Sequence, residues 1–199
     1  MSIYPNADLL LSAAHPRHFP PDLGAEVAFA GRSNAGKSSA INAITGRRAL
    51  ARTAKTPGRT RLLNFFELTP GCRIVDLPGY GYAQASAAER ATWAPMTTAL
   101  AQRASLRGLF LIIDSRRGVL AGDDGLIAWA AAVHCPVHVL LSKTDKLKRA
   151  ELARAVTAAR RALAGRAAVQ AFSAVDGSGL EDARRQLHQW FQKEKGPGG

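Results

Sequence analysis

The chain has 199 residues, enough for one domain with a sizeable core, and its 47% of hydrophobic residues excludes a wholly disordered protein. Twenty-seven lysines and arginines against 15 aspartates and glutamates leave a formal charge of +12. Such a charge is typical of proteins that bind polyanions, but a soluble, arginine-rich surface with no such partner would have the same composition. Two cysteines in no metal-ligand spacing, the absence of an apolar run long enough to cross a bilayer, and a start without a signal-peptide pattern favour a cytoplasmic protein with no membrane partner.

Apolar runs and helical patterns alternate along the chain. The expected strands are residues 27–30, 62–68, 72–75, 108–113, 137–141 and 169–172. The expected helices are residues 37–45, 87–103, 123–133, 148–164 and 179–193, and Pro95 should delay, kink or split the second of them.

This alternation predicts an α/β fold, with a mainly parallel six-stranded sheet and helices on both faces. Residues 62–68 and 72–75 are joined by Thr69-Pro70-Gly71, which predicts a hairpin and thus one antiparallel strand. We expect residues 1–23 to be an N-terminal extension, residues 24–192 to form the domain, and residues 193–199 to be a disordered tail.

A phosphate-binding pattern follows the first expected strand. Residues 31–38 match G-x-x-x-x-G-K-[ST] in full: Gly31, Arg32, Ser33, Asn34, Ala35, Gly36, Lys37 and Ser38. Backbone N–H groups of such a loop point at phosphate, Lys37 can reach the outer phosphates, and the Ser38 hydroxyl can bind Mg²⁺. A chance glycine-rich turn is the alternative, but the strand-loop-helix context favours a nucleotide, either ATP or GTP.

Three later segments favour GTP. Asp76, Leu77, Pro78 and Gly79 form D-x-x-G at a strand end, where Asp76 can hold Mg²⁺ through water and the Gly79 amide can bond the γ-phosphate. If this segment stood alone, a simple turn would be the better interpretation. In Ser142, Lys143, Thr144 and Asp145, the Asp145 carboxylate can accept hydrogen bonds from guanine N1 and N2, and the Lys143 stem can lie along the base. The backbone amides of Phe172, Ser173 and Ala174 can meet guanine O6. The order of these segments, each at a strand end, predicts one guanine-nucleotide site.

The segments GRSNAGKSS, TPGRTRLLNFF, DLPGYGYA, SKTD and FSA together resemble the EngB (YihA/YsxC) family of bacterial ribosome-biogenesis GTPases, in the TrmE-Era-EngA-EngB-septin-like superfamily. The resemblance spans about residues 24–192. It implies a Ras-like P-loop GTPase fold, slow Mg²⁺-dependent GTP hydrolysis, and a role in assembling the large ribosomal subunit that is linked to normal cell division and septation. It also implies a monomer that contacts the subunit or its precursor, with ribosomal RNA as the contact.

Site roles follow from the same resemblance. The first switch corresponds to Gly58, Arg59, Thr60, Arg61 and Leu62, with Thr60 as the second Mg²⁺ ligand beside Ser38 and the water-linked Asp76. Lys37, Thr60 and Gly79 are the groups expected to act on the transferred phosphate.

The chain departs from the wider GTPase pattern at two positions. Ser142 replaces the Asn of N-K-x-D, and we expect weaker nucleotide binding because a smaller side chain braces the phosphate loop less well. Tyr80 stands where Ras-like enzymes place a Gln, so we expect weak intrinsic hydrolysis that a partner or an ion accelerates. Asn34 resembles the Asn of GTPases that bind K⁺ beside the phosphates; alternatively, it only tolerates the backbone of the loop.

Basic residues also cluster outside the motifs. Residues 47–61 hold six of them, and others follow at Lys146, Lys148, Arg149, Arg154, Arg160, Arg161, Arg184 and Arg185. These side chains are candidates for contact with RNA, or they form a solvated surface. Two other functions remain open at this stage: a nucleotide-gated RNA- or protein-binding module with negligible catalysis, and a P-loop ATPase or kinase.

Overall fold

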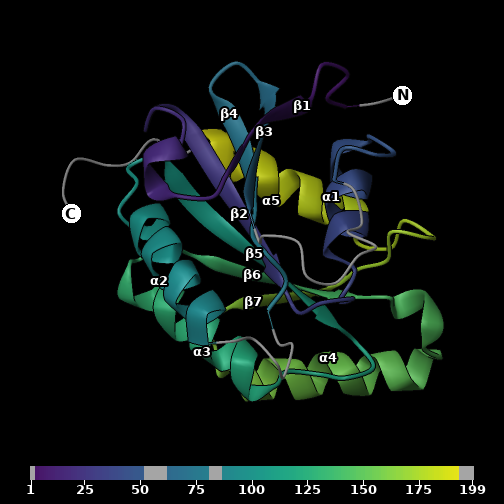
Figure 1. The fold of residues 1–199 in the computed structure, drawn as a ribbon. Helices are drawn as coiled ribbons and strands as arrows, with labels where there is room; N and C mark the ends of the chain where they lie inside the picture. Colours follow the sequence, from purple (N-terminus) through teal and green to yellow (C-terminus); the bar gives the residue numbers. More distant parts are fainter. Residues whose placement is uncertain (1–2, 52–61, 81–86, 193–199) are drawn as a thin grey trace.

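The computed structural model describes residues 3–51, 62–80 and 87–192, which form a layered α/β structure around one sheet (Figure 1). The strands are β1 (Asp8–Ala13), β2 (Ala25–Gly31), β3 (Leu63–Thr69), β4 (Cys72–Asp76), β5 (Leu106–Asp114), β6 (Val137–Ser142) and β7 (Ala168–Ala171). The helices are α1 (Lys37–Thr45), α2 (Ala87–Ala101), α3 (Ala121–Ala132), α4 (Arg149–Leu163) and α5 (Leu180–Gln192). Two short 3₁₀ turns, η1 (Pro16–His18) and η2 (Thr144–Lys146), complete the described elements.

The sheet has the strand order β1-β3-β4-β2-β5-β6-β7. Strand β2 pairs in parallel with β4 and β5, and β6 and β7 extend the parallel part. Strand β3 lies antiparallel between β4 and β1. The predicted α/β class, the mainly parallel sheet and the hairpin of β3 and β4 are therefore confirmed.

The observed sheet has seven strands rather than the six that we predicted. The additional strand, β1, lies within residues 1–23, which we expected as an extension ahead of the domain. It is an edge strand whose leucines Leu9 and Leu10 are largely exposed, so its sequence lacks the buried pattern of the central strands. The other strands and all helices are found with ends shifted by at most two residues, and Pro95 does not split α2.

Helices cover both faces of the sheet, as the alternation of side chains along β2 requires. Val27 and Phe29 pack with α1 and α5 on one face, whereas Ala28 and Ala30 pack with α2, α3 and α4 on the other. Successive residues of a strand point to opposite faces, so a strand that is apolar at nearly every position serves two cores. Strand β2 is buried over its whole length and forms the centre of the fold.

A buried ion cluster fixes the amino end of β2. Glu26 is completely buried, and its carboxylate accepts hydrogen bonds from Arg103 Nε at 2.6 Å and Nη2 at 2.8 Å. Arg73 Nε lies 3.1 Å from the same carboxylate. Both arginines also donate to the carbonyl of Pro21, which fastens the chain ahead of β2 to the sheet. A buried carboxylate is tolerated only when it is paired and hydrogen-bonded in this way.

We predict that Arg103→Met lowers the free energy of unfolding by about 3 kcal/mol, because Glu26 then stays buried with only Arg73 as its cationic partner. Urea denaturation of the purified chain measures this loss. The matched control is Arg166→Met, which breaks an exposed ion pair with Asp124 and should cost less than about 1 kcal/mol. Equal losses in the two variants would show that the buried cluster does not stabilise the fold.

Candidate functional site

The predicted motifs meet at one edge of the sheet. Strands β2, β4, β5 and β6 run in parallel, so their carboxyl ends lie together, at Gly31, Asp76, Asp114 and Ser142. The chain leaves β2 to form β3 and β4 on one side of it and then β5 on the other. This is a topological switch point, where open α/β sheets bind their ligands.

The phosphate loop connects β2 to α1 at this switch point. Gly31 must be a glycine, because a Cβ there would lie 2.8 Å from the carbonyl oxygen of Ile112 on β5. Gly36 has a φ of +99° and immediately precedes α1, which begins at Lys37. The loop therefore ends at a helix N-terminus, whose free N–H groups and dipole suit a phosphate.

The D-x-x-G segment runs beside the phosphate loop. Lys37 Nζ forms an ion pair with Asp76 Oδ1, and Ser33 N donates to the Tyr80 carbonyl at 3.0 Å. The amide of Tyr80 lies 3.3 Å from the carbonyl oxygen of Gly31. The predicted phosphate loop and D-x-x-G are thus in direct contact.

The oxygen donors here suit a magnesium ion. The pair of Lys37 and Asp76 brings a carboxylate to the first turn of α1, where Ser38 supplies a hydroxyl. Magnesium prefers a few hard oxygen ligands together with water and phosphate, and this donor set fits that preference. Within residues 3–51, 62–80 and 87–192 no group of three or more His, Cys, Asp or Glu side chains could hold a metal ion.

Tyr80 points toward α3. Its hydroxyl donates a hydrogen bond to Asp123 Oδ1 at 2.5 Å, and Asp123 is completely buried. Burial, together with this carboxylate, raises the pKa of Tyr80, so the phenol stays protonated. Asp123 Oδ2 in turn accepts from the backbone N–H of Leu120 at the start of α3.

The base-reading segment is bound to the phosphate loop. Ser142 Oγ donates to the Ala35 carbonyl at 2.5 Å, and Lys143 Nζ donates to the Asn34 carbonyl at 2.5 Å. Ser173 Oγ donates to Asp145 Oδ1 at 2.9 Å, and this hydrogen bond lowers the pKa of Asp145. Asp145 is therefore held as an anion, which can accept two hydrogen bonds from one purine edge.

The remaining predicted residues are partly within the described chain. Phe172 and Ser173 are buried directly after β7, and Ala174 is exposed beside them. Leu62 lies half-buried just ahead of β3. Gly58, Arg59, Thr60 and Arg61, with the second Mg²⁺ ligand among them, lie outside the described residues.

Two aspartates at this site escaped sequence reasoning. Asp114 ends β5 and accepts from Lys143, and Asp123 accepts from Tyr80. Asp114 directly follows the apolar run of β5, a placement like that of Asp76 after β4, so its position at the strand end was a usable signal. Asp123 carries no comparable signal, because its partner lies 43 residues away in the sequence.

Comparison with known proteins identifies the family. A family model described as "50S ribosome-binding GTPase" matches residues 26–143. The chain is 46% identical over 195 residues to "Probable GTP-binding protein EngB" of Idiomarina loihiensis, covering 96% of this chain and 95% of that protein. The protein of the same name from Coxiella burnetii is 43% identical over 195 residues, with the same coverage of 96% and 95%.

Solved structures confirm the fold. The crystal structure of a probable GTP-binding protein EngB matches with a TM-score of 0.68 and 22% identity, over 84% of this chain and 99% of that one. Era in complex with MgGDPNP and a segment of 16S ribosomal RNA matches with a TM-score of 0.63 and 17% identity, over 89% of this chain and 60% of that one. At these identities the likeness concerns the fold alone. The family model and the sequence relatives show that this chain belongs to the EngB family of GTP-binding proteins and is a GTPase.

Proposed function

We propose that this chain binds GTP and GDP with Mg²⁺ at the carboxyl edge of its sheet, hydrolyses GTP slowly, and uses the nucleotide state to control its binding to the large ribosomal subunit during assembly. The observation that carries this proposal is the convergence of the phosphate loop, D-x-x-G and the base-reading segment, joined by the contacts of Lys37 with Asp76 and of Ser142 and Lys143 with the loop. A P-loop kinase or ATPase does not need a carboxylate oriented as Asp145 is.

The proposed roles follow from where each group lies. Lys37 and the amides of the phosphate loop stabilise charge on the outer phosphates, while Ser38 and Asp76 supply ligands for magnesium, with Thr60 as the further ligand that the family implies. Bound magnesium would neutralise charge that develops on the transferred phosphate. Asp145, held by Ser173, selects guanine over adenine.

Slow hydrolysis is consistent with the position of Tyr80. Phosphoryl transfer needs a positioned water molecule, and the Tyr80 hydroxyl is engaged with Asp123 instead. The same observation favours the second candidate, a nucleotide-gated binding module with negligible catalysis. Single-turnover hydrolysis of bound GTP separates the two.

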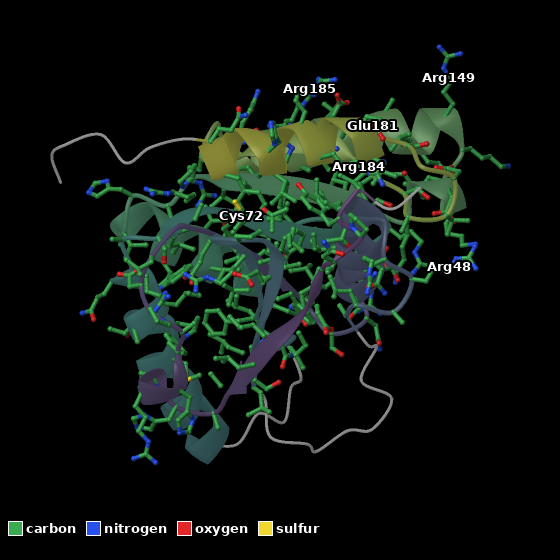
Figure 2. All side chains as sticks on the ribbon, turned by 90° about the horizontal axis from the view of Figure 1, so that it is seen from above. Arg48, Cys72, Arg149, Glu181, Arg184 and Arg185 are labelled. Atoms are coloured by element: carbon green, nitrogen blue, oxygen red, sulfur yellow. The ribbon has the colours of Figure 1, made fainter. Side chains whose placement is uncertain are left out.

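Helix α4 is the proposed contact with ribosomal RNA. It carries four exposed arginines (Arg149, Arg154, Arg160 and Arg161), preceded by the exposed Lys148 and by Lys146, which pairs with Asp145, and its one acidic residue is Glu151. By contrast, the arginines of α5 have local partners: Arg184 donates to the carbonyls at the end of α1 and pairs with Glu181, and Arg185 pairs with Asp182. Figure 2 shows Arg149 pointing away from the body of the molecule, whereas Arg184 lies under α5.

Among the residues that the structure describes, the four arginines of α4 have no ion-pair partner. Such arginines suit the phosphates of RNA, and the ribosomal subunit named in the family description is rich in RNA phosphates. Because ribosomal subunits assemble in the cytoplasm, we place the proposed activity there. We infer that any effect on cell division or septation follows from failed subunit assembly.

The first prediction from the proposed function tests the nucleotide site. Asp145→Asn should weaken GDP binding by about 10²-fold, because hydrogen bonds to a charged acceptor contribute about 1.5–3 kcal/mol each. Selectivity should shift toward xanthine nucleotides, whose C2 oxygen accepts a hydrogen bond where the 2-amino group of guanine donates one. Titration calorimetry with Mg²⁺ and GDP, XDP or ADP measures both effects. Equal or better binding of ADP by the wild type would overturn the assignment.

The second prediction tests the α4 surface. Arg154→Gln combined with Arg161→Gln should weaken binding to purified large-subunit precursor. It should also flatten the salt dependence, by about one unit of log K against log salt for each phosphate that the variant no longer neutralises. GDP affinity should not change. Arg185→Gln is the matched control, because its charge is already paired on α5. An identical salt slope in the double variant and the control would remove α4 from the interface.

The third prediction concerns K⁺. Asn34 has a φ of +62°, a conformation that Asn tolerates well, so its backbone alone can explain its presence. If its side chain also binds K⁺, single-turnover hydrolysis should be at least about tenfold faster in K⁺ than in Na⁺, since a cation at this place takes part of the role of an arginine finger. Asn34→Gly keeps the backbone conformation and should remove the difference. Equal wild-type rates in the two salts would leave only the backbone role.

A further inference from the structure

Ser142 makes a limited brace to the phosphate loop. Its Oγ lies 2.5 Å from the Ala35 carbonyl and 3.2 Å from the Ile113 carbonyl. A hydroxyl has one hydrogen to donate, whereas the amide of an Asn at the same position has two. The chain therefore lacks one hydrogen bond that the usual N-K-x-D sequence can make between this strand end and its surroundings.

Asp114 supplies a second brace from the neighbouring strand. It is 5% exposed and lies opposite Ser142 in the register of β5 and β6. Its Oδ2 accepts a hydrogen bond from Lys143 Nζ at 3.0 Å. Lys143 Nζ also donates to the carbonyl of Asn34 at 2.5 Å, so the ammonium group joins the end of β5 to the phosphate loop.

Asp114 is itself firmly held as an anion. Arg116 donates to it from Nη2 at 2.7 Å, from Nε at 3.0 Å and from its backbone N–H at 3.1 Å. The Arg116 guanidinium first, and Lys143 next, hold the pKa of Asp114 well below its usual range. Its carboxylate is therefore charged and fixed at neutral pH.

The backbone at Lys143 benefits from such support. Lys143 has a φ of +60°, a left-handed conformation that a lysine adopts at a cost, whereas Asn34, with a φ of +62°, tolerates it well. The Lys143 ammonium links these two residues, and Asp114 fixes the ammonium. Loss of the carboxylate would free the lysine side chain to leave the loop.

We propose that Asp114 is a positioning residue for the nucleotide, which holds Lys143 against the phosphate loop and so replaces the brace that an Asn at position 142 would give. The proposal rests on the nucleotide site described above. It assigns Asp114 no contact with the nucleotide: the carboxylate acts through Lys143. Arg116 has the supporting role of orienting the carboxylate.

A thermodynamic cycle tests this coupling. Asp114→Asn keeps the size of the side chain, and it should raise the dissociation constant for GDP about tenfold or more, because the charged hydrogen bond to Lys143 is removed. In a Lys143→Ala background, the same change should alter GDP affinity less than about twofold. If the loss of affinity is the same in both backgrounds, Asp114 only supports the loop after β5, and the proposal fails.

A second pair of variants keeps the test decisive if Asp114→Asn folds poorly. Arg116→Ala changes a half-exposed side chain and should weaken GDP binding by a few fold in the wild type but not in Lys143→Ala. Ser142→Asn should restore much of the affinity that Asp114→Asn removes while adding little to the wild type. If Ser142→Asn changes GDP affinity equally in the wild type and in Asp114→Asn, then Asp114 does not replace the brace of an Asn at position 142. A wild type that binds no guanine nucleotide would refute the proposed function itself, whereas tight binding with additive variants would refute only the role of Asp114.

Discussion

The burial of β2 between two parallel neighbours is the constraint on which the site depends. All seven residues of the strand are buried, and its two faces serve different cores. Because both faces are covered, the strand cannot shift by one residue without exchanging its two sets of side chains. Its register with β4 and β5 is therefore fixed, and with it the place where the phosphate loop leaves the sheet. Asp76 pairs in register with Phe29, and Ile112 with Gly31, so one strand places D-x-x-G and the end of β5 beside the loop.

Charge is distributed unequally between the two ends of β2. At its amino end, the buried Glu26 is compensated by Arg73 and Arg103, which contribute to stability and are not free to bind a ligand. At the carboxyl edge, Lys37 and Lys143 each pair with one aspartate, Asp76 or Asp114. A polyanionic ligand can compete for Lys37, because a magnesium ion that arrives with the ligand can take Asp76 away from the lysine. Lys143 can keep its partner Asp114, which Arg116 holds in place, when a ligand binds.

The sequence predicted the parts of the fold that long apolar patterns determine, and it failed where burial is partial. Central strands such as β5 and β6 are apolar nearly throughout, and helices α4 and α5 have a clear apolar period, so their existence and approximate ends could be predicted. Edge strand β1 is held by pairing with β3 more than by burial, and Leu9 and Leu10 look the same in a strand as in an exposed extension. The motif residues could be assigned because their chemistry fixes the residue type. The partnership of Asp114 with Lys143 could not, because it depends on the register of β5 against β6, which periodicity does not give.

Tyr80 links the D-x-x-G segment to two other parts of the site, one through its backbone and one through its side chain. Its backbone is paired with the phosphate loop at Gly31 and Ser33, so the tyrosine helps to keep D-x-x-G beside the phosphates. Its side chain is directed to Asp123 and the start of α3, which links the same segment to a helix on the far side of the switch point from α1. A glutamine at this position would have an amide free to orient water, whereas the phenol is committed to a buried carboxylate. Under the proposed function, such an arrangement would lengthen the lifetime of the GTP-bound form, and a partner or an ion would be needed to end it. The hydrogen bond from Tyr80 to Asp123 Oδ1 also joins the end of the Asp76–Gly79 segment to α3, where Asp123 Oδ2 accepts from the backbone N–H of Leu120 directly ahead of the helix. A movement of the segment would therefore reach α3 through this one hydrogen bond.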